Sequence, residues 1–180
     1  MGSLVGPLTT TFVAPTTCPT SFSNTYVDER TVLAIGPLRK HTECFPKNFV
    51  AVRDFYYSPG VCPAGYETAC SSFNSAGTVT ETVVTCCPRS FTCQTESIFP
   101  EQITFGCVSR TGATWTFPTL TVLSSGEPVS VKSLAFTDPL GNTGGVNAFS
   151  IQIRYQSTDF TTPTITSAVR PPQPHCLRQN

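Results

Sequence analysis

The spacing of the cysteines constrains this chain more than any other feature. Six of the nine cysteines in 180 residues fall between Cys62 and Cys107, and two of them, Cys86 and Cys87, are adjacent. Closely spaced cysteines in a chain with few candidate catalytic groups are typical of a disulfide framework, which forms in an oxidising compartment. We therefore expect a secreted or extracellular cell-surface protein. A cytosolic protein with reduced thiols or a zinc site is the alternative.

The cysteines predict four disulfides. We expect Cys18 to pair with Cys44, and the six cysteines of the cluster to pair among themselves; these are Cys62, Cys70, Cys86, Cys87, Cys93 and Cys107. Six cysteines allow fifteen connectivities, and their spacing does not choose among them. Cys176 makes the count odd, so it either forms an intermolecular bridge or has no partner.

The charge balance excludes several classes of partner. Eleven basic and eleven acidic residues cancel, and no block of like charge occurs. Binding to nucleic acid through counterion release, or to an anionic membrane, is therefore not expected. Charged residues make up only 12% of the chain, about half the usual share, and Ser and Thr take their place. A hydroxyl-rich, charge-poor composition suits secreted and cell-wall proteins.

The two ends of the chain lack targeting segments. The first residues have neither the basic nor the apolar region of a signal peptide. No apolar run reaches the roughly 18–20 residues that cross a bilayer, so no membrane span is expected in this chain. Together with the cysteines, this indicates a mature or truncated form, or an incomplete gene model.

The segments between the turns favour β-strands. Five are predicted as strands from β-branched and aromatic content or from alternation: 49–57, 78–85, 115–122, 128–132 and 148–156. No segment shows an amphipathic helical repeat. The predicted fold class is mostly β with little or no helix, in which a small disulfide-rich N-terminal region is followed by a cysteine-free β extension.

Four regions follow along the chain. Residues 1–17 are predicted as a flexible N-terminal segment, 18–110 as the disulfide-stabilised region, 111–158 as the β extension and 159–180 as a Thr/Pro-rich flexible tail. Within the extension, Pro118 is expected to lie at a sheet edge or a bulge because it cannot donate to a ladder.

The chain offers no convincing catalytic or metal-binding constellation. There is no Cys-X-X-Cys motif, and the cluster does not have zinc-site spacing. The two histidines, His41 and His175, have no nucleophile and acid arranged around them by sequence, and no two carboxylates are paired by spacing. We predict no enzyme, no metal and no cofactor.

Aromatic residues are the remaining candidates for a ligand. Tyr56, Tyr57, Tyr66 and Trp115 are the candidate ligand-facing rings, with Phe73 and Phe91 as further members of a flat aromatic face. Small disulfide modules bind chitin with such rings. The alternative, which we favour, is that most of these rings fill the core.

Two segments resemble a known group of proteins. Residues 55–66 (FYYSPGVCPAGY) and 86–93 (CCPRSFTC) are similar to the ectodomain of uncharacterised ascomycete fungal surface proteins. The likeness continues at 145–157 (GVNAFSIQIRYQS), so it spans most of positions 8–160. Members of that group carry a signal peptide and one transmembrane helix after the ectodomain, and this chain departs from them at both ends. The resemblance implies a location and carries no established activity.

The expected function is therefore a non-catalytic, secreted or cell-surface cysteine-rich fungal protein with a structural or interaction role at the cell wall. Its expected partner is a cell-wall polysaccharide or another surface protein. The alternatives are a small carbohydrate-binding module for chitin or glucan, and a secreted effector-like protein.

Overall fold

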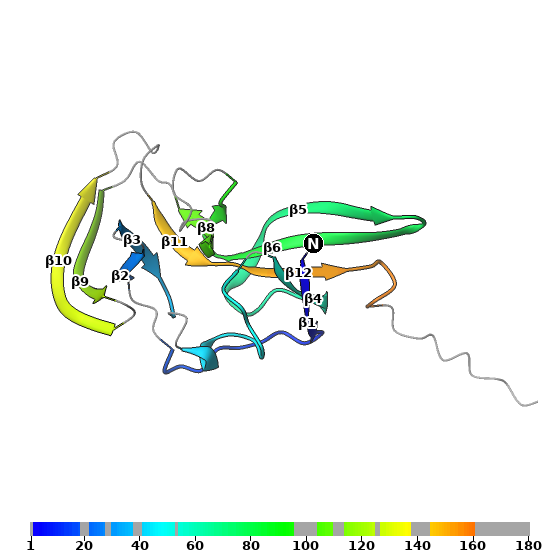
Figure 1. The fold of residues 1–180 in the computed structure, drawn as a ribbon, viewed down its shortest axis with the longest axis horizontal. Coiled ribbons are helices and arrows are strands. Elements are labelled where there is room, and N and C mark those ends of the chain that lie inside the picture. Colours follow the sequence, from blue (N-terminus) through cyan, green and yellow to red (C-terminus); the bar gives the residue numbers. More distant parts are fainter. Residues whose placement is uncertain are drawn as a thin grey trace, which may run out of the picture.

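The computed structural model describes residues 2–18, 22–27, 30–37, 41–52, 54–95, 104–109, 114–124, 127–137 and 145–160. Its strands form two sheets, one of five strands and one of seven (Figure 1). A short 3₁₀ helix, η1 (Thr42–Cys44), lies in the loop before the fourth strand. The fold is mostly β with little helix, as predicted.

The five-stranded sheet has the order β1-β4-β12-β6-β5. Its strands are β1 (Ser3–Leu8), β4 (Phe55–Gly60), β12 (Ile151–Tyr155), β6 (Val79–Pro88) and β5 (Tyr66–Ala76). The seven-stranded sheet has the order β10-β9-β2-β3-β11-β8-β7. Its strands are β10 (Glu127–Thr137), β9 (Thr114–Ser124), β2 (Phe22–Val27), β3 (Arg30–Ile35), β11 (Val146–Phe149), β8 (Gly106–Ser109) and β7 (Thr92–Cys93).

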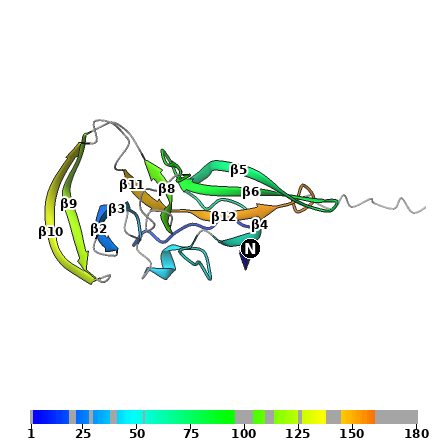
Figure 2. The ribbon, with the colours of Figure 1, turned by 45° about the horizontal axis from the view of Figure 1, so that its top comes forward.

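Strands β11 and β12 join the two sheets. Only Ser150 separates them, and its N–H donates to the carbonyl of Phe105 at 2.6 Å. The two strands run end to end through the middle of the molecule in both views (Figures 1 and 2). The predicted alternation is confirmed from Ile151 to Arg154, where Ile151 and Ile153 are 1% and 3% exposed and Gln152 and Arg154 are partly exposed, whereas Ala148, Phe149 and Ser150 are all buried. The predicted single strand is instead two, because the chain changes sheets at Ser150.

The apolar core lies on one face of the five-stranded sheet, which we call the core face. Tyr57, Val84, Cys86, Ile151 and Ile153 are all buried there. A cluster of stacked and edge-on phenylalanines covers them: Phe45 stacks on Phe49 with ring centroids 4.2 Å apart, and Phe149 lies 5.8 Å from Phe45 and 4.8 Å from Phe105. Such pairs stabilise a core beyond the area that they bury.

The start of the strand predicted at 49–57 is wrong. The strand β4 begins at Phe55, and residues 49–52 form turns in which Phe49 N–H donates to Pro46 O at 3.0 Å and Val52 N–H donates to Val50 O at 2.8 Å. Local turn bonds compete with a sheet ladder for the same backbone groups. The turns also place the Phe49 ring on Phe45, so burial of the ring favours the loop.

The regions predicted along the chain need two corrections. Residues 3–8 lie within the segment predicted to be flexible, yet they form β1 and pair in parallel with β4. Residues 111–158 do not form a separate extension, because β12 is hydrogen-bonded between β4 and β6 in the middle of the five-stranded sheet. Residues 161–180, with Cys176 and His175, lie outside the described residues.

Other predicted strands are confirmed with small changes of bounds. The segment 78–85 is part of β6, and 115–122 and 128–132 lie within β9 and β10. The register between β9 and β10 shifts between the pairs Lys132↔Leu120 and Leu134↔Phe117, which places Pro118 in a bulge as predicted.

Candidate functional site

Four disulfides staple the molecule at one end of the five-stranded sheet. Cys18 is bonded to Cys44 as predicted, and the six cluster cysteines pair among themselves as Cys62–Cys86, Cys70–Cys93 and Cys87–Cys107. Each closes a loop with a sequence separation of 20 to 26 residues. Loops of this length give roughly 3 kcal/mol of stabilisation per bridge. Disulfides persist in oxidising compartments, so the four bridges indicate an extracellular environment.

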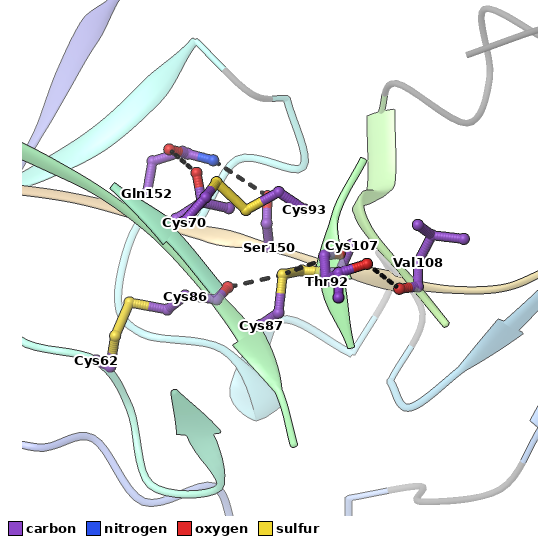
Figure 3. Close-up of a disulfide and its surroundings, with 11 residues drawn as sticks. Cys62, Cys70, Cys86, Cys87, Thr92, Cys93, Cys107, Val108, Ser150 and Gln152 are labelled. Atoms are coloured by element: carbon purple, nitrogen blue, oxygen red, sulfur yellow. Dashed lines mark hydrogen bonds between the residues drawn. A yellow bond between two sulfur atoms is a disulfide. The ribbon is translucent and has the colours of Figure 1, made fainter. Parts of the chain in front are cut away.

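The adjacent residues Cys86 and Cys87 pack in two different clusters of the core. Successive side chains of a strand point to opposite faces, and Figure 3 shows the Cys62–Cys86 and Cys87–Cys107 bridges leaving β6 in different directions. Cys86 packs with Ile151 in the main core. Cys87 and Cys107 pack with Ala148 in a second, smaller cluster.

Polar side chains fill the space between these bridges. Thr85 donates its hydroxyl hydrogen to Gln152 Oε1 at 3.0 Å, and Gln152 Nε2 donates to Ser150 Oγ at 3.4 Å. Nearby, the Thr92 hydroxyl donates to Val108 O at 3.2 Å (Figure 3). These bonds satisfy buried polar groups where the two sheets meet, so they hold the scaffold together rather than offering free groups to a ligand.

Two of the predicted ligand-facing tyrosines belong to the core. Tyr57 is 4% exposed, and its hydroxyl donates to Pro46 O at 3.1 Å and to Lys47 O at 3.0 Å. Burial raises the pKa of Tyr57 to about 12, and it raises the pKa of Tyr66 to about 12 as well. Tyr57 therefore cannot face a ligand, and for this residue the core interpretation is confirmed.

Tyr66 lines a cavity that is too small for a sugar. The cavity has a volume of about 20 Å³, and apolar side chains such as Phe12, Phe45 and Ile151 form its other walls. That volume is about the space of one water molecule. A larger hollow of about 240 Å³ lies along the loop 42–52, but its lining offers one hydroxyl, from Thr42, among apolar side chains. Neither concavity has the converging polar groups of a ligand site.

One face of the Tyr56 ring is covered by the side chain of Arg154. The guanidinium carbon of Arg154 lies 3.7 Å from the centroid of this ring, in a cation–π contact. Arg154 Nη1 also lies 3.8 Å from Glu81 Oε2, and Asn74 Nδ2 donates to the same oxygen at 3.5 Å. These four residues form a polar ladder across β5, β6, β12 and β4, on the face opposite the core face. Trp115 lies on β9, and its side chain is outside the described part of the chain.

Three aromatic residues lie toward the hairpin end of the five-stranded sheet, and two of them are in ring contact. Phe73 pairs with Thr82, and Thr82 pairs with Tyr155, so the three side chains follow one row across β5, β6 and β12. Phe160 packs against Tyr155 with ring centroids 5.6 Å apart. Phe73 is 77% exposed and Phe160 is 45% exposed. We call Phe73, Tyr155 and Phe160 the distal aromatic patch.

A turn at the end of β12 holds Phe160 in the patch. Gln156 N–H donates to Asp159 Oδ2 at 2.6 Å, and Asp159 N–H donates to Gln156 O at 3.1 Å. In both views this turn lies beside the outer part of the β5–β6 hairpin (Figures 1 and 2). The hydroxyls of Ser75 and Thr80, 3.3 Å apart, lie on the adjoining part of the hairpin. The patch is thus aromatic and hydroxyl-rich, and the carboxylate of Asp159 is engaged in the turn.

Sequence reasoning named only Phe73 of this patch. Tyr155 follows the buried alternation of Ile151 and Ile153, so the pattern assigns it to the core. The structure agrees, since Tyr155 is partly buried and packs against the main core cluster, while its ring also contacts Phe160. The signal that identifies the patch is the strand register, which the sequence does not carry.

The described residues give no indication of metal or membrane chemistry. No group of three or more His, Cys, Asp or Glu side chains among them is placed to hold a metal ion. His41 Nδ1 lies 3.5 Å from Glu43 Oε1 at η1. Within the same residues, every helix is too short to cross a membrane. Comparisons with protein-family models, with curated proteins and with solved structures find no match for this chain.

Proposed function

We propose that this chain is a non-catalytic, secreted or cell-surface protein of a filamentous fungus, with a structural or interaction role at the cell wall. The four disulfides support the extracellular part of this proposal, since such bridges are rare in a reducing cytosol. The resemblance of 55–66, 86–93 and 145–157 to fungal surface ectodomains supports the fungal and cell-wall part.

The distal aromatic patch is the observation that favours an interaction role. Phe73 is 77% exposed, so its ring is costly to hydrate and gives the isolated molecule little packing, and Phe160 is 45% exposed at the end of β12. Exposed apolar clusters of this kind mark sites where a partner binds. The polar ladder on the opposite face and the disulfides at the base hold the strands that present the patch.

A carbohydrate-binding module for chitin or glucan is the second candidate, with a secreted effector-like protein as a variant of the same interaction role. The geometry of the row favours the sugar ligand: Phe73 and Tyr155 share a face and lie two strands apart, which is about 9.5 Å at the usual strand spacing. Two rings at that distance match alternate sugar rings of an extended β-linked chain. The neutral, hydroxyl-rich surroundings suit an uncharged polysaccharide.

The compartment is tested on the protein from its native source. Intact mass under non-reducing conditions is expected to fall by eight hydrogens relative to the reduced chain, and the protein is expected in the culture medium or the cell-wall fraction. Full-length protein with free thiols in the cytosolic fraction would overturn the proposal.

The ligand is tested by co-sedimentation of the oxidised protein with insoluble chitin and with β-glucan. Retention on one of them, reduced at least tenfold in Phe73→Ala and Phe160→Ala, supports the carbohydrate candidate. Val131→Ala, which shortens a side chain that is 65% exposed on β10, is the matched control and should not change retention. If the protein binds neither polysaccharide, the carbohydrate candidate is excluded, and binding to isolated cell-wall protein becomes the test of the interaction role.

A further inference from the structure

Strand β5 is the edge of the five-stranded sheet at the hairpin side. From Thr68 to Ala76 it contains no charged residue and no proline. Its outer part, Ser71 to Ala76, pairs with β6 without a register shift, and Ser71 to Ser75 are exposed. An edge strand presents a row of unpaired backbone N–H and C=O groups to solvent, which is a template for another strand.

The other sheet edges carry the features that prevent strand addition. Strand β1 contains Pro7 and has two register shifts, and β10 contains Pro128 and Lys132 and also has two. The edge strand β7 has two residues. Proline, lysine, bulges and short length are the usual protections of an edge. The outer half of β5 lacks all four, so among the described strands it is the edge that is open to a partner strand.

We propose that β5 pairs antiparallel with β5 of a second copy of this chain, around a two-fold axis at Phe73. The pairing joins two five-stranded sheets into one continuous sheet. It places Phe73 opposite Phe73 of the partner subunit, and Ser72 opposite Asn74 of the partner subunit. No charged side chain meets a like charge, because the paired segments carry none.

The exposed phenylalanine selects this register. Pairing that keeps the core faces of both copies on the same side requires opposite residues to share a face. Centring the axis on Ser72 or Asn74 meets that condition but places Phe73 opposite a serine. Only the axis at Phe73 brings the two rings together, and cross-strand aromatic pairs are among the most stabilising. It also removes from water a ring that is 77% exposed in the single copy.

The second copy is favoured over an unrelated peptide because the strand is complementary to itself in both charge and side-chain size. The dimer would also unite the two distal aromatic patches in one row on a single face. The pairing stands independently of any polysaccharide, since it is measured without a ligand.

A disulfide trap tests the register in the full chain. In a Cys176→Ser background, a mixture of Ser72→Cys chains and Asn74→Cys chains should form a disulfide-linked heterodimer on mild oxidation, because these two positions lie opposite each other in the proposed register and Phe73 is retained. Ser75→Cys is the matched control: in the proposed register the two Ser75 positions are displaced by about 13 Å along the strands, beyond the Cα separation of about 4.4–6.8 Å that a disulfide needs. Peptide mapping checks that the four native bridges remain. Equal or faster cross-linking of Ser75→Cys would overturn the proposal.

Sedimentation equilibrium tests the dimer without cross-linking. The wild-type chain should show a monomer–dimer equilibrium, and Phe73→Lys should weaken it by about tenfold or more, because a charge on the edge opposes its symmetry mate. Val131→Ala should leave the equilibrium unchanged, and near-UV circular dichroism verifies that each variant is folded. A wild-type chain that stays monomeric at the highest soluble concentration would also overturn the proposal.

Discussion

Cys86 and Cys87 are neighbours on β6, and both are fully buried, yet they are bonded to cysteines in two different parts of the molecule. Cys62, the partner of Cys86, lies in the loop that follows β4, a strand of the same five-stranded sheet as β6. Cys107, the partner of Cys87, lies on β8 in the seven-stranded sheet. The adjacent pair therefore links the two sheets through one strand, using the alternation of side chains along it.

Removal of either bridge should destabilise the protein strongly. We expect each double substitution to lower the free energy of unfolding by about 3 kcal/mol: Cys62→Ala with Cys86→Ala, and Cys87→Ala with Cys107→Ala. The two bridges join residues with sequence separations of 24 and 20, and their removal frees these loops in the unfolded chain. Urea denaturation followed by circular dichroism measures the loss. A change below about 0.5 kcal/mol for either pair would contradict the role of that bridge.

Tyr57 should make stability depend on pH in the alkaline range. Burial raises its pKa to about 12, above the value of about 10 in an unfolded chain. The folded state thus favours the neutral phenol, so its contribution is complete below pH 10 and is lost as the pH rises through 12. Tyr57 should account for a fall of up to about 2–3 kcal/mol in the free energy of unfolding across this range. Tyr66, whose pKa burial also raises to about 12, adds its own fall, so the free energy of unfolding of Tyr57→Phe should still fall, but less than that of the wild type.

The same substitution has a cost at neutral pH. Tyr57→Phe removes the hydroxyl that donates to the carbonyls of Pro46 and Lys47, so it should lower stability by about 1 kcal/mol at pH 7. Tyr155→Phe removes a phenol from a half-buried ring of the distal aromatic patch and serves as the control. If the two variants show the same alkaline dependence, Tyr57 is not its source.

Gly60 should not tolerate a side chain. A Cβ at this position would lie 2.9 Å from Ile153 Cβ and 3.2 Å from the carbonyl oxygen of Tyr57. Gly60→Ala should therefore lower the free energy of unfolding by about 1–3 kcal/mol through overpacking. Ser72→Thr adds a methyl group at the exposed edge and should change it by less than about 0.5 kcal/mol. Thermal and urea denaturation compare the two; equal stabilities would show that β4 and β12 can separate freely at Gly60.

Arg154 and Tyr56 should be coupled energetically. A double-mutant cycle of Arg154→Met and Tyr56→Leu should give a favourable coupling of about 0.5–1 kcal/mol, since the guanidinium lies over the ring and is only partly exposed. Val131→Ala, at an exposed position on β10 in the other sheet, supplies the unrelated variant for the cycle. Strict additivity of Arg154→Met and Tyr56→Leu would show that the cation–π contact does not stabilise the fold.

Much of the local structure can be predicted from short segments of the sequence. The alternation predicts which side chains are buried on β12, and Pro118 predicts a bulge, because both depend on the geometry of single residues and their neighbours. The alternation does not predict that Ala148 and Ser150 are buried as well, because that burial depends on how the two sheets meet. The loop at 49–52 is predicted wrongly as a strand because its β-branched residues fit a strand equally well. What decides it is the packing of Phe49 on Phe45, a contact outside the local pattern.

The candidate site is predicted poorly for a related reason. Tyr57 and Tyr66 lie in an aromatic-rich segment around Cys62, and the sequence makes them candidates for a ligand-binding face. In the structure the Tyr57 ring is buried and the Tyr66 ring lines a small cavity in the core. Tyr155 packs against the main core, as its place in the alternation predicts, and what the sequence does not show is its contact with Phe160. Exposure of a ring depends on where its strand runs past the covering layer, and that is set by strands far away in the chain.

The sequence by itself determines that this protein is β-rich, disulfide-stapled and charge-poor, because strand propensity, cysteine content and charge are properties of the residues. Only the tertiary structure decides which of the fifteen connectivities forms in the six-cysteine cluster and which rings reach the surface. Both depend on the pairing of β6 with β5 and β12, which brings together residues about seventy positions apart, such as Thr85 and Gln152. Register is a cooperative property of whole strands. The partners of Cys86 and Cys87 are therefore fixed only when β6 lies within the sheet and directs the two side chains to opposite faces.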